Sequence, residues 1–258
     1  MGVALSRGFH VSFQDVGTGP ALVLVSGFAW PASSWVDLGY VDPLVRHGYR
    51  VLTVDPLGHG LSEKPHAWEA YQAPEIGSDI VAAMDAADVQ RAVLWGYSRG
   101  AALVTMAATE HLDRVAALIV GGLTWIAPPP PQGGISPLVE ALQRGSWSDF
   151  CTELGEPISD ADRQIMEASD PRAMAAVDIA RGRSTYAPDP TCIHVPTLLY
   201  YGSDDSWAPV DAAAKAFGLE PRMLPGHDHS GAFRDSESVL RIVLEFLADV
   251  YPACPESH

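Results

Sequence analysis

The residues best suited to chemistry centre on Ser98, which lies in the sequence Gly-Tyr-Ser-Arg-Gly at positions 96–100. The apolar residues 92–95 before it are typical of a buried strand, and the alanine-rich residues 101–108 after it are typical of a helix. A serine on so tight a strand-to-helix turn is held in strained backbone geometry, with its hydroxyl exposed at the end of a sheet. Glycines on both sides let the two backbones approach closely. The pattern therefore indicates a nucleophile rather than a buried structural serine.

A serine hydroxyl is a weak nucleophile, so the chain must also supply a base and a group that orients this base. Both follow the ends of later predicted strands. A loop with Asp204 and Asp205 follows the strand expected at residues 197–201, and a loop with His227 and His229 follows the next strand. The residues alone leave open which aspartate and which histidine take part.

These side chains need a sheet to position them, and the hydrophobic pattern predicts one. Residues 9–16 alternate apolar and polar side chains, as expected of an antiparallel edge strand. Continuous apolar runs typical of buried parallel strands occur at residues 21–25, 50–54, 92–95, 115–120 and 197–201. Helical patterns occur at residues 35–47, 76–87, 99–111, 210–217 and 236–251. The alternation predicts an α/β fold, in which a mostly parallel central sheet has helices on both faces.

One segment, residues 123–193, interrupts the alternation because it contains no buried strand. It begins with a proline-rich stretch and continues with four helical patterns, at residues 137–144, 147–154, 161–168 and 172–183. We interpret residues 123–193 as a helical cap inserted over the sheet, with residues 1–122 and 194–258 forming the core. An irregular crossover with extra surface helices is the alternative interpretation.

The composition argues against several classes of function. The 258 residues carry a net charge of −16, which opposes nucleic-acid binding. The chain has no apolar run of membrane length and no signal peptide, so we expect a cytoplasmic protein that does not bind membranes. The cysteines, Cys151, Cys192 and Cys254, lack the spacing of a disulfide framework or a thiolate metal site. The expected partner is a small-molecule substrate, and the oligomeric state stays open.

Four segments together resemble the α/β-hydrolase superfamily, and the resemblance extends over nearly the whole chain. Positions 96–100 resemble its nucleophile elbow, and positions 55–62 resemble its Asp-x-x-Gly-x-Gly-x-Ser loop. Residues 195–205 resemble the segment with the catalytic acid, and residues 224–229 resemble the segment with the catalytic histidine. The resemblance implies the α/β-hydrolase fold and a triad in the order serine, acid, histidine.

The family pattern also chooses between the neighbouring candidates, because its acid and its histidine each commonly stand three residues after a glycine. This spacing selects Asp205 over Asp204, whose other interpretation is a turn or cap residue. It selects His229 over His227, which then becomes a polar loop residue. Some members of the family carry the acid after the strand that follows the elbow helix, but residues 120–124 of this chain include no carboxylate.

The resemblance further implies an oxyanion hole made of two backbone N–H groups. One would come from Arg99, directly after the nucleophile, and the other from Phe28, in the loop after the strand at 21–25. The family usually has a histidine where this chain has Ser26. We expect Ser26 to brace the loop rather than to act as a second nucleophile.

These roles predict a cofactor-independent serine hydrolase that cleaves a carboxylic ester or lactone through an acyl-enzyme. Ser98 would attack, His229 would transfer the proton and Asp205 would orient the imidazole. No metal is implied, and the serine at the elbow disfavours the dehalogenase and epoxide-hydrolase branches, which use aspartate there. The alternatives are carbon–carbon bond hydrolysis, peroxyacid formation (perhydrolysis), amide cleavage or acyl transfer by the same triad, and a ligand receptor of low turnover on the same fold.

The substrate pocket is less closely defined by the sequence. Its candidate residues are Trp30, Trp125, Ile126, Trp147 and Tyr186. Phe150 and Met166 are further apolar residues of the insert. Each of these side chains could instead pack the cap onto the sheet. Together with the acidic composition, they favour a small, fairly apolar substrate and disfavour an anionic one.

Overall fold

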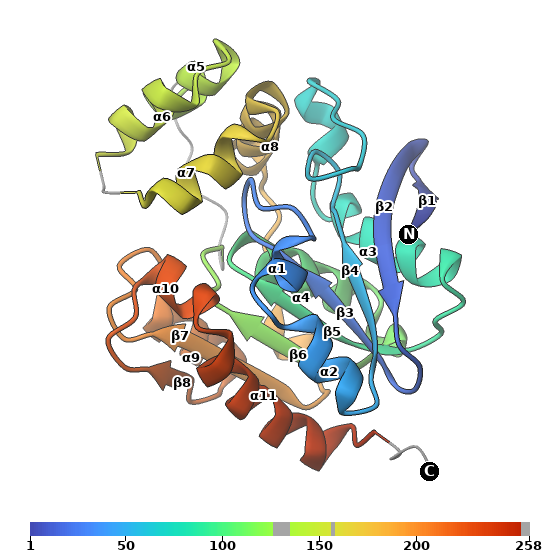
Figure 1. Ribbon diagram of the computed structural model, residues 1–258. Helices are drawn as coiled ribbons and strands as arrows, with labels where there is room; N and C mark the ends of the chain where they lie inside the picture. The colour runs from blue at the N-terminus through green and yellow to red at the C-terminus, as the bar shows by residue number, and fades with distance from the viewer. Residues whose placement is uncertain (126–134, 156–157, 254–258) are drawn as a thin grey trace.

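The protein is described by a computed structural model that covers residues 1–125, 135–155 and 158–253 (Figure 1). Its described residues form one eight-stranded sheet with the order β1-β2-β4-β3-β5-β6-β7-β8. The strands are β1 (Gly2–Ser6), β2 (Phe9–Val16), β3 (Ala21–Val25), β4 (Arg50–Val54), β5 (Ala92–Tyr97), β6 (Val115–Gly121), β7 (Thr197–Gly202) and β8 (Arg222–Leu224). β2 is antiparallel to both β1 and β4, and the other neighbouring pairs are parallel. The predicted α/β class and mostly parallel sheet are confirmed.

The expected edge strand at residues 9–16 is β2, but it is not the edge, because β1 pairs along its outer side. The sequence of β1 does not show the hydrophobic pattern of a strand. Its apolar Val3 and Leu5 are exposed, whereas Ala4 and Ser6 are buried. An alternation whose buried side carries only small residues gives little hydrophobic signal.

The helices follow the predicted patterns with two differences. The core helices are α1 (Ser34–Asp37), α2 (Val41–Arg46), α3 (Ser78–Ala86), α4 (Arg99–Glu110), α9 (Val210–Phe217), α10 (His229–Arg234) and α11 (Ser236–Val250). Short 3₁₀ turns are η1 (Trp68–Tyr71), η2 (Glu75–Gly77), η3 (Leu112–Arg114) and η4 (Pro190–Cys192). The single helix expected at 35–47 is split into α1 and α2 around Gly39, whose φ of +82° ends the first helix. α10 was not predicted.

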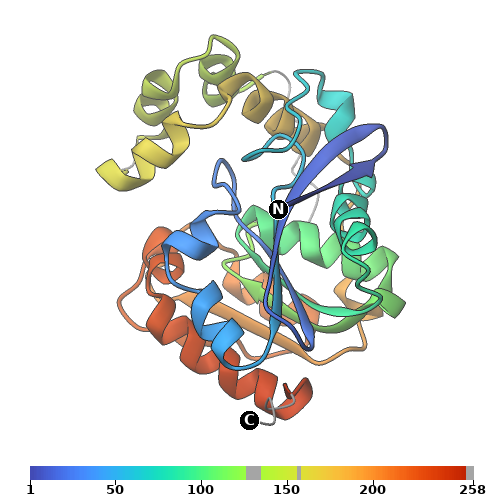
Figure 2. The ribbon, with the colours of Figure 1, turned by 45° about the vertical axis from the view of Figure 1, so that its right-hand side comes forward.

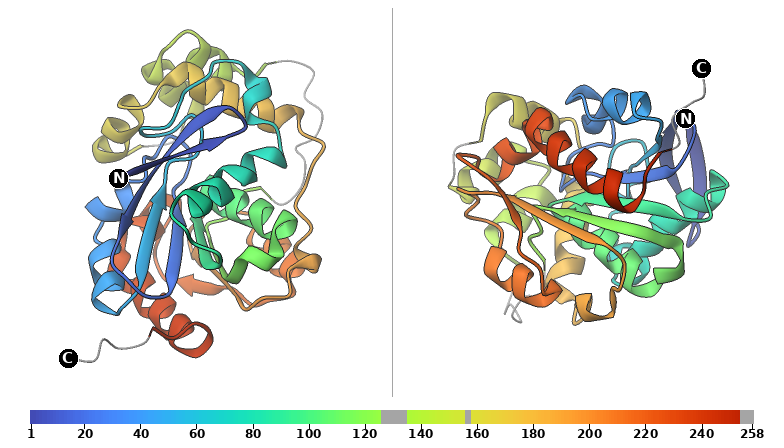
Figure 3. Two further views of the ribbon diagram at one scale, coloured as in Figure 1. Left: turned by 90° about the vertical axis from the view of Figure 1, so that its right-hand side faces the viewer. Right: turned by 90° about the horizontal axis from the view of Figure 1, so that it is seen from below.

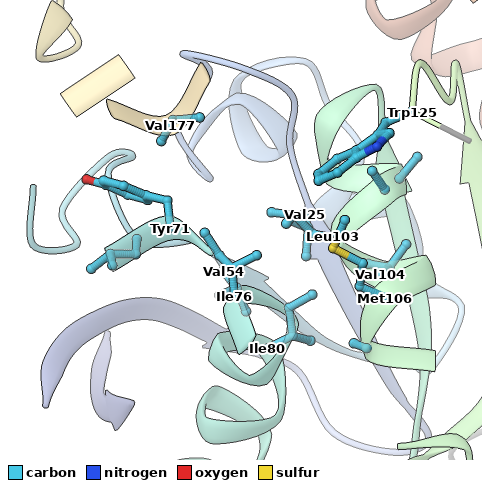
Figure 4. Packing of buried hydrophobic residues seen from close by; sticks show 14 of the residues in the cluster. Val25, Val54, Tyr71, Ile76, Ile80, Leu103, Val104, Met106, Trp125 and Val177 are labelled. Atoms are coloured by element: carbon cyan, nitrogen blue, oxygen red, sulfur yellow. The ribbon is translucent and has the colours of Figure 1, made fainter. Parts of the chain in front are cut away.

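Each face of the sheet packs against its own set of helices (Figure 3). Because neighbouring side chains of a strand point to opposite faces, Leu24 packs with α1, α2 and α11, while Val25 packs with α3 and α4. Trp35 and Trp95 belong to the hydrophobic cluster on the face of Leu24, which we call the first cluster; their ring centroids are 5.0 Å apart. The cluster on the face of Val25 is the second. Figure 4 shows part of the second cluster, including Leu103 of α4. The rigid sheet thus holds the carboxyl ends of β3, β5 and β7 in fixed positions.

Four further helices, α5 (Pro137–Gln143), α6 (Trp147–Leu154), α7 (Asp160–Glu167) and α8 (Pro171–Arg183), stand together apart from the sheet (Figures 1 and 2). Each begins at a side chain that accepts a hydrogen bond from a backbone N–H of its first turn: Ser136, Ser146, Ser159 and Asp170. α8 is tied to the core by the Arg183 guanidinium, 4.6 Å above the ring of Trp68. The helices agree with the predicted insert, and its division into a separate cap stays a prediction.

Within the ranges that the structure describes, no helix is both long and apolar enough to cross a membrane.

Candidate active site

Ser98 occupies a strained turn between β5 and α4. Its φ of +55° and ψ of −118° lie outside the regions that side chains other than glycine usually adopt. A Cβ on Gly96 would lie 2.2 Å from the carbonyl oxygen of Gly100, and a Cβ on Gly100 would lie 2.1 Å from that of Val25. Both glycines are therefore required for the close approach of strand and helix, as the sequence pattern predicts.

Three strand ends bring Ser98, Asp205 and His229 into contact. His229 Nε2 lies 2.9 Å from Ser98 Oγ, and His229 Nδ1 lies 2.7 Å from Asp205 Oδ2. The Asp205 side chain is fully buried, and its Oδ1 accepts hydrogen bonds from the backbone N–H groups of Trp207 and Ala208 at 2.9 and 3.1 Å. The acid is thus held by two backbone groups while its other oxygen faces the imidazole.

The electrostatic surroundings keep Asp205 ionised. Burial raises the pKa of this carboxyl group, but the hydrogen bond and positive charge of His229 oppose the effect. With the two backbone N–H groups, they hold the pKa of Asp205 below its ordinary value. The site therefore keeps a negative charge against His229 Nδ1 at neutral pH.

The neighbouring candidates Asp204 and His227 point elsewhere. Asp204 is exposed and accepts a hydrogen bond from the Ser203 hydroxyl at 2.8 Å. His227 Nε2 lies 3.1 Å from Asp235 Oδ2. Among the contacts of the described residues, neither reaches Ser98, so the structure brings Asp205 and His229 to the serine instead.

The expected oxyanion donors belong to two segments next to Ser98. Arg99 is the first residue of α4, so its backbone N–H has no acceptor one helical turn earlier. Phe28 follows Gly27, where a Cβ would lie only 3.2 Å from Ser98 Cβ. The loop that carries Phe28 therefore lies directly against the serine.

Two side chains brace this loop. The Ser26 hydroxyl donates a hydrogen bond to the Trp30 carbonyl at 2.7 Å, so the bracing role expected for it is confirmed. Asp55, from the Asp-x-x-Gly-x-Gly-x-Ser segment, accepts hydrogen bonds from the N–H groups of Ala32 and Leu61 at 2.6 and 3.0 Å. Asp55 thereby ties the loop after β3 to the loop after β4. The motif is visible in the sequence, but its bracing role is not.

A cavity of about 550 Å³ opens in front of Ser98 and His229. Its wall is mostly apolar and comes from both the core and the α5–α8 group. The large apolar residues that line it are Phe28, Trp30, Phe150, Leu154, Ile158, Met166, Trp207 and Phe233. Of the pocket residues expected from the sequence, the structure therefore places Trp30 at the wall, together with Phe150 and Met166 of the insert.

Three of the predicted pocket residues do not line this cavity. Trp125 is buried in the core beside α4 (Figure 4). Trp147 lies behind the wall, with its ring centroid 5.3 Å from that of Phe150, and its Nε1 donates to the Ser169 carbonyl. The Tyr186 hydroxyl donates to Glu110 at 2.8 Å. Packing needs and polar partners thus hold these rings elsewhere, and Ile126 lies outside the described residues.

Two aromatic residues next to His229, Trp207 and Phe233, were not predicted from the sequence. Trp207 stands two residues after Asp205, and its ring centroid lies 5.1 Å from that of His229 with an interplanar angle of 34°. Phe233 lies one helical turn after His229 and also faces the cavity. Two signals could have identified them: the position of Trp207 two residues after the acid, and the i,i+4 spacing of His229 and Phe233, had a helix been expected there.

In the described part of the chain, no group of three or more histidine, cysteine, aspartate or glutamate side chains is arranged to hold a metal ion.

Comparisons with known proteins agree with the fold. Residues 20–134 match the family model described as alpha/beta hydrolase fold. A putative non-heme chloroperoxidase of Synechocystis sp. is 26% identical, over 94% of this chain and 96% of that protein. Epoxide hydrolase A of Mycobacterium tuberculosis is 38% identical over 38% of this chain and 30% of its own length. The crystal structure of the enol-lactonase from Burkholderia xenovorans superposes with a TM-score of 0.81, at 21% identity, over 96% of this chain and 100% of that chain.

Proposed function

Because this chain belongs to the α/β-hydrolase superfamily, we propose that it is a cofactor-independent serine hydrolase of carboxylic esters or lactones. The observation that carries the proposal is the continuous set of contacts from Asp205 through His229 to Ser98. An esterase or lactonase needs such an activated serine beside a pocket for an acyl group. Both features are present at one end of the sheet.

In the proposed reaction, the Ser98 hydroxyl attacks the carbonyl carbon of the substrate while His229 Nε2 accepts its proton. Asp205 holds Nδ1–H and stabilises the imidazolium that forms. The proton then passes from Nε2 to the leaving alkoxide, and the acyl group stays on Ser98 Oγ. A water molecule, deprotonated by His229, attacks this ester and releases the acid.

The backbone N–H groups of Phe28 and Arg99 would stabilise the negative charge of the tetrahedral intermediate. Removing one such donor typically lowers turnover by about 100- to 1000-fold. The Ser26 and Asp55 hydrogen bonds support the assignment, because they fix the loop that carries Phe28. A donor must be in place before charge develops if it is to lower the barrier.

The cavity supports a small, fairly apolar substrate. A volume of about 550 Å³ suits a small molecule, and aromatic rings dominate the wall. We include in the proposal that residues 123–193 act as a cap, because Phe150, Leu154 and Met166 supply the wall from the α5–α8 group.

Epoxide hydrolysis is disfavoured despite the similarity to an epoxide hydrolase. A carboxylate nucleophile opens an epoxide to an ester, which water can hydrolyse. Ser98 would instead form an ether, which water would not release. Peroxyacid formation is the second candidate, supported by the match to a putative chloroperoxidase. In that reaction hydrogen peroxide, rather than water, attacks the acyl-enzyme and leaves with the acyl group.

The test is labelling with a fluorophosphonate probe, followed by peptide mass mapping and by turnover of a chromogenic short-chain ester. We expect one adduct per chain on the peptide with Ser98, and neither labelling nor turnover in Ser98→Ala. Folded protein that neither labels nor hydrolyses any ester would contradict the proposal and favour a ligand receptor. Hydrogen peroxide that outcompetes water for the acyl-enzyme would favour the second candidate.

A further inference from the structure

The cavity wall has an unequal distribution of charge. Its lining residues include the carboxylates of Asp162 and Asp228 but no lysine or arginine among the residues that the structure describes. Asp228 is exposed to solvent, whereas Asp162 of α7 is only 7% exposed. A charge at a buried position is screened less by water and salt than one at the surface. Of the two carboxylates on the wall, Asp162 is therefore the one less screened by solvent.

Asp162 is held in place by a complete set of partners. Its Oδ1 accepts hydrogen bonds from both Nε and Nη2 of Arg234, the former at 3.0 Å. Its Oδ2 accepts a hydrogen bond from the Ser159 hydroxyl at 2.7 Å. The carboxylate thus joins α7 to α10, the helix that begins with His229.

Arg234 is a cation in direct contact with two residues of the wall, Asp162 and Trp30. Its guanidinium carbon lies 5.2 Å above the ring centre of Trp30, a cavity residue, and its side chain is 31% exposed. Arg234 itself does not line the cavity, whereas its partner Asp162 does. A carboxylate on a substrate would need this guanidinium as its partner, and Asp162 already occupies that position.

We propose that Asp162 is a specificity-determining residue, which restricts the cavity to uncharged acyl or alcohol groups by excluding carboxylates. The inference rests on the proposed function for its meaning in catalysis, although the exclusion itself concerns binding. A substrate carboxylate would meet a like charge on the wall and would leave its own water without gaining a cationic partner. An uncharged group of the same shape has neither disadvantage.

Removing the charge of Asp162 should change the ratio of the affinities for an uncharged ligand and a carboxylate ligand. Asp162→Asn keeps the shape and the oxygen that faces Arg234, but it leaves the guanidinium charge uncompensated. The wall then changes from repelling to attracting a carboxylate. With an effective dielectric constant near 20, removal of one charge close to the bound ligand should shift relative binding by at least about tenfold.

The experiment compares two matched ligands, benzyl succinamate with a terminal carboxamide and monobenzyl succinate with a terminal carboxylate. Their binding is measured by tryptophan fluorescence in the Ser98→Ala background, because Trp30 and Trp207 line the cavity. Their kcat/KM values are measured in the wild-type protein. Binding does not require chemistry, so the binding ratio decides the inference even if neither ester is hydrolysed, whereas the proposed function is decided by fluorophosphonate labelling of Ser98 and by turnover of other esters.

We expect the carboxamide to bind at least about tenfold more tightly than the carboxylate, and Asp162→Asn to abolish or reverse this preference. The matched control is Asp160→Asn, an exposed carboxylate of the same helix that does not line the cavity, which should leave the preference unchanged. Arg234→Gln should strengthen the preference, because it leaves Asp162 unpaired. Thermal unfolding of each variant verifies folding.

Three results would overturn the inference. One is equal binding of the two ligands to the protein with Asp162 intact. Another is the same ratio in the Asp162→Asn and Asp160→Asn variants. The third is failure of both ligands to bind at millimolar concentration, since the cavity would then not accept the uncharged ester that the inference requires.

Discussion

Asp205 keeps its negative charge although its side chain is fully buried, because both carboxylate oxygens have hydrogen-bond partners. Two of these donors are backbone groups of residues 207 and 208, which sit in the same loop and cannot rotate away. A group whose folded pKa lies below its ordinary value stabilises the fold above the unfolded pKa, and the effect is lost as the pH falls through the folded pKa. Asp205 thus links orientation of the base to stability of its loop.

Asp205→Asn should lower kcat by about 10⁴-fold, because the neutral amide neither stabilises the imidazolium nor enforces the required tautomer of His229. The amide oxygen can still accept the backbone hydrogen bonds, so the loop should stay folded. The measurement is kcat for a chromogenic ester at neutral pH, with circular dichroism as the test of folding. Asp204→Asn is the matched control and should keep the wild-type kcat, and a larger loss in this variant would reassign the acid.

The triad residues could be predicted because short sequence patterns mark them. Ser98 needs a glycine-flanked turn between a strand and a helix, which is a short sequence pattern. Asp205 follows the end of a strand that an apolar run identifies, and the glycine spacing of the family pattern selects it over Asp204, as it selects His229 over His227. The cavity wall could not be predicted in the same way. Which face of α6 points inward depends on how the helix docks, so Phe150 lines the cavity while Trp147, three residues earlier, lies behind it.

At the scale of elements, the loop between β4 and η1 supports the site although its residues do not line the cavity. The Ser62 hydroxyl donates to the Asp55 carbonyl and accepts from the N–H of Ser12, and Gly60 lies so close to Asp55 that a Cβ there would collide with its carboxylate. His59 is buried in this loop, 1% exposed, and its Nε2 has no hydrogen-bond partner among the described residues. Burial, together with the nearby charge of Arg99, lowers its pKa to about 3.

His59 should make the protein sensitive to acid. The unfolded chain protonates this residue near its ordinary pKa of 6.5, whereas the folded chain does so only near 3. The unfolded state therefore binds more protons between these values, and stability falls as the pH drops from 6.5 toward 3. The loss from this residue amounts to about 2 kcal/mol at about pH 5.

The measurement is urea unfolding of wild type and His59→Gln at neutral pH and at about pH 5. The glutamine amide can still donate to the Leu57 carbonyl, which lies 3.2 Å from His59 Nδ1. It does not titrate, so the variant should lose about 2 kcal/mol less stability on acidification than the wild type. Equal losses in both proteins would show that His59 is not protonated on unfolding in this range.

For the whole molecule, the alternation of apolar strands and helices was sufficient to predict the sheet, because a parallel strand buried on both faces leaves a continuous apolar run. The order of the strands and the place of β1 required the structure. β1 carries Val3 and Leu5 on its exposed side, so its pairing with β2 comes from backbone hydrogen bonds at the sheet edge rather than from a buried apolar stripe. The break of the expected 35–47 helix at Gly39 likewise depends on a single positive φ.

The net charge of the chain acts on the molecule as a whole. Its 32 acidic residues exceed its 16 basic residues, so the folded surface repels itself at neutral pH. Ion pairs such as Arg114 with Asp85 offset little of this repulsion, because an exposed pair contributes at most about 1 kcal/mol. Raising the ionic strength shortens the screening length from about 30 Å at 0.01 M to about 8 Å at 0.15 M. The added salt should therefore weaken the repulsion between distant acidic side chains more than the attraction within ion pairs at hydrogen-bond distance.

We therefore expect the Tm at neutral pH to rise by a few degrees when sodium chloride is increased from about 0.01 M to about 0.15 M. Differential scanning calorimetry gives the measurement. The control is the same salt series near the sequence pI of about 4.7, where the net charge vanishes and the added salt should not raise the Tm. A Tm that falls with salt at neutral pH would mean that attractive pairs outweigh the repulsion, and that the acidic excess is arranged so as not to oppose folding.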